Sequence, residues 1–315
     1  MSAPDPVVDL YAGVDGGATK TLLRLEDAAG LILGEGHGGP ANIRLSVEES
    51  WRSIRAALAQ ALAAAGLHPD DGRYRISCGA GLAGTEVAAA RDRFLAAAHP
   101  FTRLVLRSDG YTSCLGAHGG DDGAVIAVGT GTIGFQIESG RESRVGGWGF
   151  PQGDEGGGAW LGLEATRKTL QWLDGRAPAD PLLAAIQARF DGDLSRLVAW
   201  ANDASGTEFA QLAPLVVEHV ARETPLALAL VRAAAGELDR IGRALDAKSR
   251  RPLPCCVLGG LGAFFEPWLE PALRARLVPG RYDTLAGALF MVRADAAARA
   301  DADAREARLP VGGTV

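Results

Sequence analysis

Apolar and polar residues alternate in short blocks at the start of the chain. Three strand-like runs are separated by the polar turns DGGA and AAG, and they cover residues 8–14, 19–27 and 31–37. Apolar runs of this length, bounded by glycine-containing turns, predict β-strands. The pattern therefore predicts three short strands, with the first two joined at a glycine-rich tip.

The next segment changes to a helical period. Between residues 47 and 65, Trp51, Ile54, Leu58 and Leu62 recur at intervals of three and four. This spacing places them on one face of a helix. Ser46 and Glu49 stand at its start in the arrangement of a capping box. We expect a helix that packs its apolar face onto the preceding strands.

Strands and helices then alternate to the end. The expected strands are residues 74–80, 102–109, 124–128, 133–139, 141–147 and 254–258, and the expected helices are 86–98, 111–118, several within 161–247, and 284–300. Such alternation is typical of α/β proteins. The order strand, glycine turn, strand, turn, strand occurs near residue 15 and again near residue 130, which suggests two domains of related architecture.

The length and net charge of the chain argue against some classes of function, namely nucleic-acid and membrane binding. The chain has 315 residues, 47% of them hydrophobic, and a net charge of −6, which fits a globular protein of two domains. The acidic balance argues against nucleic acid or an anionic membrane as the main partner. The start MSAPDPVVDL lacks the pattern of a signal peptide, and no apolar run reaches the roughly 20 residues that span a bilayer. We expect a cytoplasmic protein.

Cysteine and histidine offer little metal chemistry. The four cysteines are Cys78, Cys114, Cys255 and Cys256, without CxxC spacing, and the five histidines stand singly. Isolated residues of these types are more typical of buried thiols and ordinary side chains than of zinc sites or disulfides. We expect neither.

The first glycine turn carries more chemistry than a hairpin needs. After Asp15 the chain continues with Gly16, Gly17, Ala18, Thr19 and Lys20. A hairpin is the simpler interpretation, since Asp-Gly is a common hairpin turn. Bare backbone amides with hydroxyls also form an anion site, and a carboxylate beside a phosphate suits a bridging Mg²⁺ ion. Lys20 is either a further positive charge at the site or a solvated side chain.

Two later turns resemble the first. Thr130, Gly131 and Thr132 follow the strand 124–128, and VLGGLG follows a strand that begins at Pro254. One glycine turn is weak evidence of a ligand site. Three of them, with an aspartate on the first and threonines on two, favour phosphate binding.

Asp109 ends a strand and precedes a helix. Its residue type there supports two interpretations equally. Aspartate is a common helix N-cap. It is also a general base that accepts a proton from a hydroxyl attacking a phosphoryl group, and α/β sheets bind ligands at the carboxyl ends of their strands.

The run VGGWGFPQGDEGGGAWLG (145–162) is too rich in glycine for a regular element. Its acids, Asp154 and Glu155, could bind sugar hydroxyls or a cation. A solvated surface loop is the alternative, and Trp148 and Trp160 argue against it.

Taken together, these motifs resemble the actin-like sugar kinase superfamily. VDGGATKT is similar to its first phosphate motif, with Ala18 in place of a glycine, AVGTGT to the second, and VLGGLG to the adenosine motif. GGPANIRLS, GLAGTE, AHPF, VGGWGFPQGDEGGGAWLG and TLAGALFM resemble segments of bacterial glucosamine kinases in the same order. The resemblance covers nearly the whole chain and points to the N-acetylglucosamine and glucosamine kinases, in the BadF/BadG-type ATPase branch.

The resemblance implies a role for each motif. ATP would be bound by Gly16, Gly17, Thr19, Lys20, Thr130, Gly131, Thr132, Gly259 and Gly260, and Mg²⁺ by Asp15 through water. The sugar would contact Asn42, Asp109, Gly146, Gly147, Asp154 and Glu155, with Asp109 as the base for its 6-hydroxyl. The implied activity is ATP-dependent phosphorylation of glucosamine, with N-acetylglucosamine as the alternative substrate.

The implied fold is the actin-like ATPase (ribonuclease H-like) fold. A small first domain, residues 1–112, would be rejoined by the C-terminal helix at about 284–300, and a larger one would span 113–283, with a flexible tail at 305–315. The resemblance implies a cleft between the domains that closes on both substrates. A homodimer is common in this family. The rival functions are an activator ATPase of a dehydratase or reductase, and a non-catalytic sugar sensor.

Overall fold

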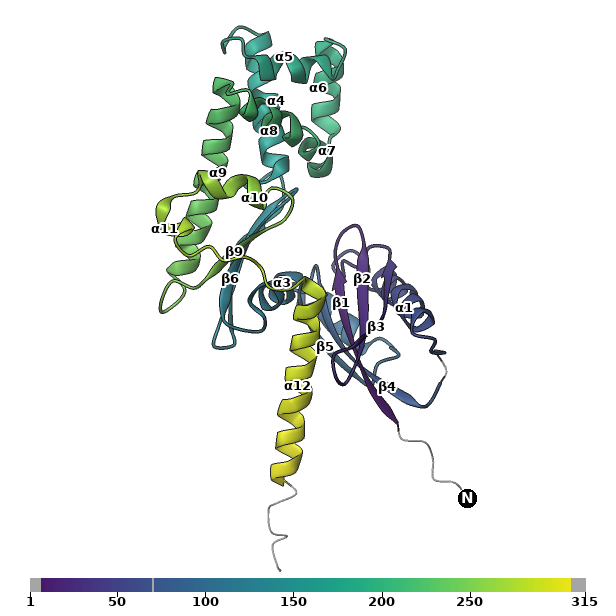
Figure 1. The fold of residues 1–315 in the computed structure, drawn as a ribbon. Coiled ribbons are helices and arrows are strands. Elements are labelled where there is room, and N and C mark those ends of the chain that lie inside the picture. Colours follow the sequence, from purple (N-terminus) through teal and green to yellow (C-terminus); the bar gives the residue numbers. More distant parts are fainter. Residues whose placement is uncertain (1–6, 70, 307–315) are drawn as a thin grey trace, which may run out of the picture. The chain divides into compact units, whose positions relative to one another are not determined.

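The computed structural model describes residues 7–69 and 71–306, which form two compact units (Figure 1). The first unit comprises the chain up to Asp121 together with the chain from Gly280 onward, and the second comprises Asp122–Pro279. Each unit has its own mixed sheet and its own hydrophobic core. The predicted α/β class is confirmed.

The sheet of the first unit has the strand order β3-β2-β1-β4-β5. Its strands are β1 (Val8–Gly16), β2 (Thr21–Asp27), β3 (Ile32–Gly38), β4 (Tyr74–Leu82) and β5 (Arg103–Ser108). The first three form an antiparallel meander, and β4 and β5 run parallel to β1. The three strands predicted at the start of the chain are therefore present.

Helices cover both faces of this sheet. They are α1 (Val47–Ala64), α2 (Ala88–Ala96), α3 (Asp109–His118) and α12 (Thr284–Glu306). Figure 1 shows α1 on one side of the sheet and α3 with α12 on the other. Helix α12 returns to this unit from the end of the chain, as predicted for the segment 284–300.

Helix α1 forms as its period predicts. Trp51, Ile54, Leu58 and Leu62 are all buried in the core of the first unit. Ser46 is the N-cap, and its hydroxyl accepts a hydrogen bond from the amide of Glu49 at 3.1 Å. The reciprocal half of a capping box is not formed here, and the Glu49 carboxylate pairs with Arg52.

Helices α3 and α12 cross at very close range. A Cβ atom on Gly287 would lie 1.9 Å from the carbonyl oxygen of Thr112, and one on Gly116 would lie 2.1 Å from that of Asp283. Glycine is required at both positions because backbone meets backbone. This packing holds all of α3 in the first unit, so the units divide at 121/122 and not at the expected 112/113.

The second unit has the strand order β8-β7-β6-β9. Its strands are β6 (Gly123–Val128), β7 (Thr132–Glu138), β8 (Arg141–Gly146) and β9 (Cys255–Leu258). Strands β6, β7 and β8 form an antiparallel meander, and β9 runs parallel to β6. The meander repeats the arrangement of β1 to β3, as the recurring turn pattern predicted, and its parallel neighbour β9 corresponds to β4.

The chain between strands β8 and β9 is mostly helical. It contains α4 (Gly158–Leu173), α5 (Pro181–Ala188), α6 (Leu194–Asp203), α7 (Gly206–Ala210), α8 (Ala213–Ala221) and α9 (Pro225–Asp246), and after β9 come α10 (Gly262–Phe265), the 3-10 helix η1 (Glu266–Trp268) and α11 (Pro271–Arg274). Helix α9 buries Leu230, Ala234 and Leu238 on one stripe. The mostly helical stretch predicted for 161–247 is confirmed.

The last helix extends beyond the predicted segment. Helix α12 ends at Glu306, so the first residues of the predicted tail at 305–315 are helical, and 307–315 lie outside the described residues. None of the helices in the described part of the chain combines the length and apolarity that a membrane crossing requires.

Candidate active site

Three chain segments of the first unit end at the same edge of its sheet. Strand register places Gly16 of β1 beside Leu82 of β4, and Leu82 beside Ser108 of β5. The three strands are parallel, so their carboxyl ends meet there, which is where α/β sheets bind ligands. Asp15 and Asp109 are thereby brought to one edge from β1 and from the start of α3.

The tip between β1 and β2 is a true hairpin turn. The Gly17 amide donates to the carbonyl of Lys20 at 3.1 Å, and Thr19 and Lys20 are exposed. A Cβ atom on Gly17 would have no neighbour within 4 Å. Internal packing therefore does not require glycine at this position, and the bare backbone faces open space in which a ligand could approach closely.

Asp15 is the most electrostatically perturbed group at this edge. Burial raises its pKa to about 6, the carboxylates of Asp109 and Asp283 add to the effect, and Lys20 opposes it. The charges of Asp109 and Asp283 therefore both act on Asp15. The coupling of Asp15 to Lys20 favours the interpretation of that lysine as a positive charge at the site.

The structure separates the two interpretations of Asp109. The N-cap of α3 is Ser108, whose hydroxyl accepts the Tyr111 amide at 3.2 Å. Asp109 is the first helical residue and not the end of the strand, and its carboxylate accepts the amide of Gly110 at 2.8 Å. Because Ser108 performs the capping, the cap does not account for a carboxylate at position 109.

Asn42 also lies at this edge, although it belongs to the loop after β3. It forms an isolated parallel bridge with Ala83, and the amide of Ala83 donates to Gly16 at 2.9 Å. The Asn42 side-chain oxygen accepts the Arg44 amide at 3.1 Å, and the side chain is half-buried. The predicted sugar contact is thus held beside the turn after β1.

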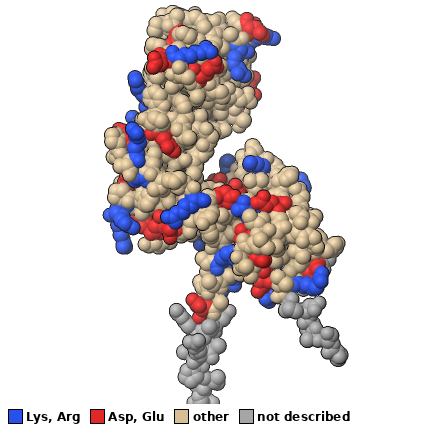
Figure 2. Space-filling model, viewed as in Figure 1, with Lys and Arg blue, Asp and Glu red and all other residues tan. Residues whose placement is uncertain are grey.

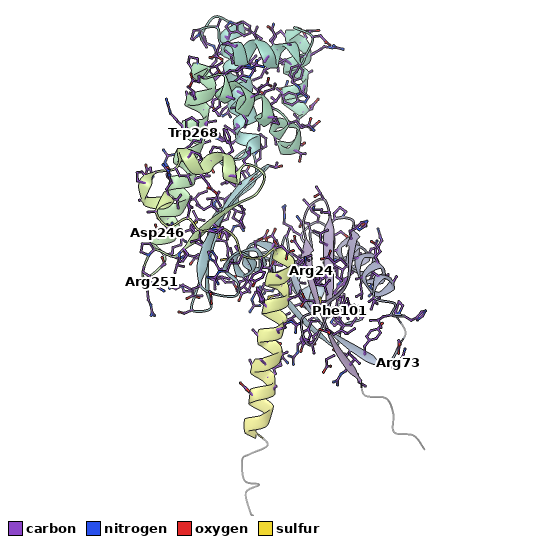
Figure 3. The ribbon with its side chains drawn as sticks, in the orientation of Figure 1. Arg24, Arg73, Phe101, Asp246, Arg251 and Trp268 are labelled. Carbon is purple, nitrogen blue, oxygen red and sulfur yellow. The ribbon has the colours of Figure 1, made fainter. Side chains whose placement is uncertain are left out.

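Sequence reasoning missed Arg24 and Asp283 in this region. Asp283 precedes α12 and accepts the Ala286 amide at 2.8 Å. Arg24 of β2, labelled in Figure 3, binds the same carboxylate. An aspartate directly before an apolar helix is a capping signal, which could have singled out Asp283. Nothing in the sequence links it to Arg24.

The second unit presents two of the predicted turns side by side. Residues 129–132 join β6 to β7, and Gly259 follows β9, the parallel neighbour of β6. Gly259 has φ +90°, and a Cβ atom there would lie 2.3 Å from the carbonyl oxygen of Val128, so only glycine fits. Gly129 and Gly260 face open space. Both turns therefore expose bare backbone at one edge of this sheet.

The two threonines of the 129–132 turn differ in exposure. Thr130 is exposed, whereas Thr132 is buried, and its hydroxyl has no hydrogen-bond partner among the described residues. A ligand outside the turn can therefore meet the hydroxyl of Thr130. Exposure favours Thr130 over Thr132 as a phosphate contact.

The glycine-rich run after β8 is an irregular loop that leads into α4. Gly146 and Gly147 both have positive φ, and Arg144 hydrogen-bonds the carbonyls of both. Trp148 is 71% exposed, with the Arg144 guanidinium 5.0 Å from its ring centroid. The expectation that Trp148 argues against a surface loop is wrong, whereas Trp160 packs against the core.

The two acids of this loop have different surroundings. Glu155 is exposed. Asp154 is half-buried, has φ +63°, and accepts the Gly149 amide at 3.3 Å. Burial raises the pKa of Asp154, and the hydrogen bonds from the backbone of Gly149 and Thr132 oppose that effect. Glu155 is therefore the acid open to a ligand.

Metal and surface chemistry are limited in the described part of the chain. No three His, Cys, Asp or Glu side chains among those residues form a group that could enclose a metal ion. Figure 2 shows acidic and basic side chains interspersed over the visible face of each unit, in keeping with the net charge of −6.

Comparisons with known proteins identify proteins that are similar to this chain in sequence and in structure. Glucosamine kinase GspK of Vibrio cholerae is 35% identical over 283 residues, which cover 90% of this chain and 95% of that protein. The crystal structure of a candidate N-acetylglucosamine kinase from Chromobacterium violaceum is 39% identical and has a TM-score of 0.81, covering 92% of this chain and all of that one. A second candidate N-acetylglucosamine kinase, from Porphyromonas gingivalis, has a TM-score of 0.63 at 18% identity over 91% of this chain and 98% of that one, and shares the fold.

The family comparison agrees with these likenesses. Residues 12–261 match the BadF/BadG/BcrA/BcrD ATPase family, and this range includes both phosphate motifs, Asp109 and the Gly259 turn. The two-unit architecture, with a mixed sheet in each unit, is the actin-like ATPase fold that the resemblance implied. The chain belongs to the BadF/BadG/BcrA/BcrD ATPase family.

Proposed function

We propose that this protein is an ATP-dependent amino-sugar kinase that phosphorylates the 6-hydroxyl of glucosamine. The observation that carries the proposal is the position of Asp109, a carboxylate at the carboxyl end of β5 whose helix is capped by Ser108. The likeness to Vibrio glucosamine kinase GspK over most of both chains supports this substrate class.

Asp109 acts as the general base in this proposal. It accepts the proton of the 6-hydroxyl while the sugar oxygen attacks the γ-phosphorus of ATP, and the bond from that phosphorus to the β-phosphate oxygen breaks to release ADP. Gly16, Gly17, Thr19 and Lys20 would bind ATP phosphates in the first unit. In the second unit Thr130 and Gly131, with the neighbouring Thr132, would do so, and Gly259 and Gly260 would meet the adenosine side.

Magnesium fits the residues around Asp15. This carboxylate is mostly buried and has another carboxylate, Asp109, as a like-charged neighbour, with Lys20 as the opposing cation that lowers its pKa. A cation held there through water would compensate the buried charge. When bound, Mg²⁺ supplies charge neutralisation for the transferring phosphoryl group.

The residues that the resemblance assigns to the sugar come from both units. Asn42 would contact a hydroxyl in the first unit, and Gly146, Gly147 and Glu155 would line the sugar site in the second. Asp154 would line the sugar site as well, as the resemblance implies. A homodimer and a cytoplasmic location stay predictions.

The test is ADP release by the purified protein with ATP and Mg²⁺, alone and with glucosamine, N-acetylglucosamine or glucose. We expect strong stimulation by glucosamine. Stimulation by N-acetylglucosamine alone would keep the kinase and change its substrate, because one sugar carries a cationic amine and the other a neutral amide. ATP turnover that is indifferent to every sugar would contradict the proposal.

Two rivals predict different results. An activator ATPase would hydrolyse ATP without a sugar and hold an iron–sulfur cluster. Its cluster would need accessible thiolates, whereas Cys78, Cys114, Cys255 and Cys256 are all buried, and burial raises the pKa of the Cys255 thiol to about 12. An iron assay on anaerobically purified protein measures this directly. A sugar sensor would bind glucosamine in calorimetry without releasing ADP.

A further inference from the structure

The turn at residues 129–132, here called the phosphate hairpin, is enclosed by the chain that follows β8. The amide of Gly147 donates to the carbonyl of Thr132 at 3.0 Å. At the other end of the loop, the amides of Gly158 and Ala159 donate to the carbonyls of Gly129 and Thr130 at 2.8 and 2.9 Å. The glycine-rich loop (147–157) therefore begins and ends on the phosphate hairpin.

Asp154 joins the middle of this loop to the same hairpin. Its carboxylate accepts the amide of Gly149 within the loop at 3.3 Å, and the backbone of Thr132 in the hairpin opposes the rise of its pKa. A Cβ atom on Gly131 would lie 2.2 Å from Asp154 Oδ2, so the carboxylate rests directly on the Gly131 backbone. The side chain thus lies directly against the hairpin at Gly131.

The backbone of Asp154 is adapted to this contact. Its φ of +63° lies in the left-handed region, which costs free energy for a residue other than glycine, although aspartate and asparagine tolerate it best. The carbonyl of Asp154 accepts the Gly157 amide at 3.0 Å, and Gly157 lies against Gly131 so closely that a Cβ atom would be 2.9 Å from the Gly131 Cα. The sharp turn of the loop at Asp154 places its carboxylate against Gly131 of the hairpin.

We propose that Asp154 is a positioning residue that holds the phosphate hairpin in its nucleotide-binding conformation. The side chain would fix the hairpin from the inner side and leave the exposed Thr130 for the phosphate. It would also join the loop assigned to the sugar to the hairpin assigned to ATP. This inference rests on the proposed kinase function and adds an indirect role to the sugar contact that the resemblance implies for Asp154.

The distinguishing measurement is nucleotide binding without any sugar. Asp154→Gly removes the carboxylate without left-handed strain, and Asp154→Asn keeps one acceptor oxygen. We expect the Kd for ADP with Mg²⁺, measured by calorimetry, to rise about tenfold in Asp154→Gly, with a smaller rise in Asp154→Asn. In steady-state assays the KM for ATP should rise more than the KM for glucosamine.

Asp191 supplies matched controls. It is also an aspartate of the second unit with positive φ, +56°, but it lies in the turn before α6, and its carboxylate pairs with Arg196. Asp191→Gly and Asp191→Asn make the same chemical and backbone changes away from the hairpin. We expect the ADP affinity and both KM values of these variants to match those of the wild type.

A second substitution tests the contact from the hairpin side. Gly131→Ala places a methyl group 2.2 Å from Asp154 Oδ2, too close for both to stay in place. If the methyl acts by displacing Asp154, its effect on the Kd for ADP should be several-fold smaller in the Asp154→Gly background than in the wild type. Equal effects in both backgrounds would contradict the contact that the proposal needs.

The outcomes distinguish the positioning role of Asp154 from the proposed kinase function. Unchanged ADP affinity with a weakened affinity for glucosamine in Asp154→Gly would overturn the positioning role and make Asp154 a sugar ligand, while the kinase function would stand. A lower melting temperature with unchanged Kd and KM values would show a purely structural role. A wild-type protein that binds no ADP would contradict both the kinase function and the positioning role.

Discussion

Arg24 and Asp283 form a bidentate ion pair that ties β2 to the start of α12. The guanidinium donates from Nη1 to Oδ1 at 3.1 Å and from Nη2 to Oδ2 at 2.7 Å, and its Nε donates to Glu35 at 2.7 Å. The Arg24 side chain is 17% exposed. The pair thus secures the segment that returns the chain to the first unit, next to the carboxylate of Asp15.

Removing the guanidinium should cost stability. Arg24→Gln leaves Asp283 and Glu35 without their shared cation, and we expect a loss of about 1 kcal/mol in the free energy of unfolding, discounted for the half-exposed carboxylates. Urea denaturation at neutral pH measures it. In a background of Asp283→Asn the same substitution should cost less, and equal costs in both backgrounds would show that the pair is not coupled.

The same pair predicts the behaviour in acid. Burial raises the pKa of Asp283, but the hydrogen bonds and charge of Arg24 outweigh it, so the pKa is lowered from 3.8. A lowered folded-state pKa contributes stability above pH 3.8 that is lost as the pH falls through the folded value. Asp283→Asn should therefore flatten the stability profile below about pH 4, and an unchanged profile would contradict this origin.

Asp109→Asn should separate chemistry from binding. The amide keeps the shape of the side chain but cannot accept the sugar proton, so we expect turnover to fall by roughly 10²–10⁴-fold while the affinities for ATP and sugar change little. Ser108→Ala is the control, because it removes the cap of α3, at a cost of about 1 kcal/mol of stability, and leaves the base in place. Retained turnover in Asp109→Asn would remove Asp109 from the mechanism.

Asp15 should make the metal-free protein less stable as the pH rises from 4 to 6. Its folded pKa of about 6 exceeds the ordinary value of 3.8, so over this range the folded state binds more protons than the unfolded state. Asp15→Asn should abolish that slope and, at pH 7, raise the free energy of unfolding by on the order of 2 kcal/mol. Melting curves in the presence of a chelator measure both effects. A steeper slope in the variant would contradict the burial of the charge.

Two helical glycines should respond oppositely to the same substitution. Gly287→Ala in α12 forces a methyl group against the Thr112 carbonyl, 1.9 Å away, and should lower the free energy of unfolding by more than about 2 kcal/mol. Gly236→Ala in α9 meets nothing within 4 Å and should stabilise by up to about 1 kcal/mol. Similar melting temperatures for the two variants would show that the α3–α12 crossing adjusts freely.

Much of the fold follows from local pattern. The spacing of Trp51, Ile54 and Leu58 determined both the existence of α1 and its buried face, because a helix turns its side chains at a fixed 3.6-residue period. The DGGA turn likewise determined a hairpin, and with it the placement of Asp15 at a strand end. The resemblance of ordered motifs added the architecture of two related units.

The tertiary structure alone decided how particular side chains are used. Position 109 fits both a cap and a base in sequence, and only the hydroxyl of Ser108 on the Tyr111 amide shows which residue caps α3. The sequence places Trp148 in a glycine-rich loop but does not say that its ring is exposed.

Contacts between distant residues could not be predicted from one sequence. Arg24 and Asp283 are 259 residues apart, and Asp154 meets Gly131 only because the loop turns through a left-handed residue. Local propensity is set by neighbours along the chain, so the sequence by itself determined the strands, the helices and the glycine turns of this protein. The tertiary structure decided which groups the carboxylates contact. Whether a carboxylate lies against a guanidinium, an amide or a glycine backbone depends on how separate elements pack.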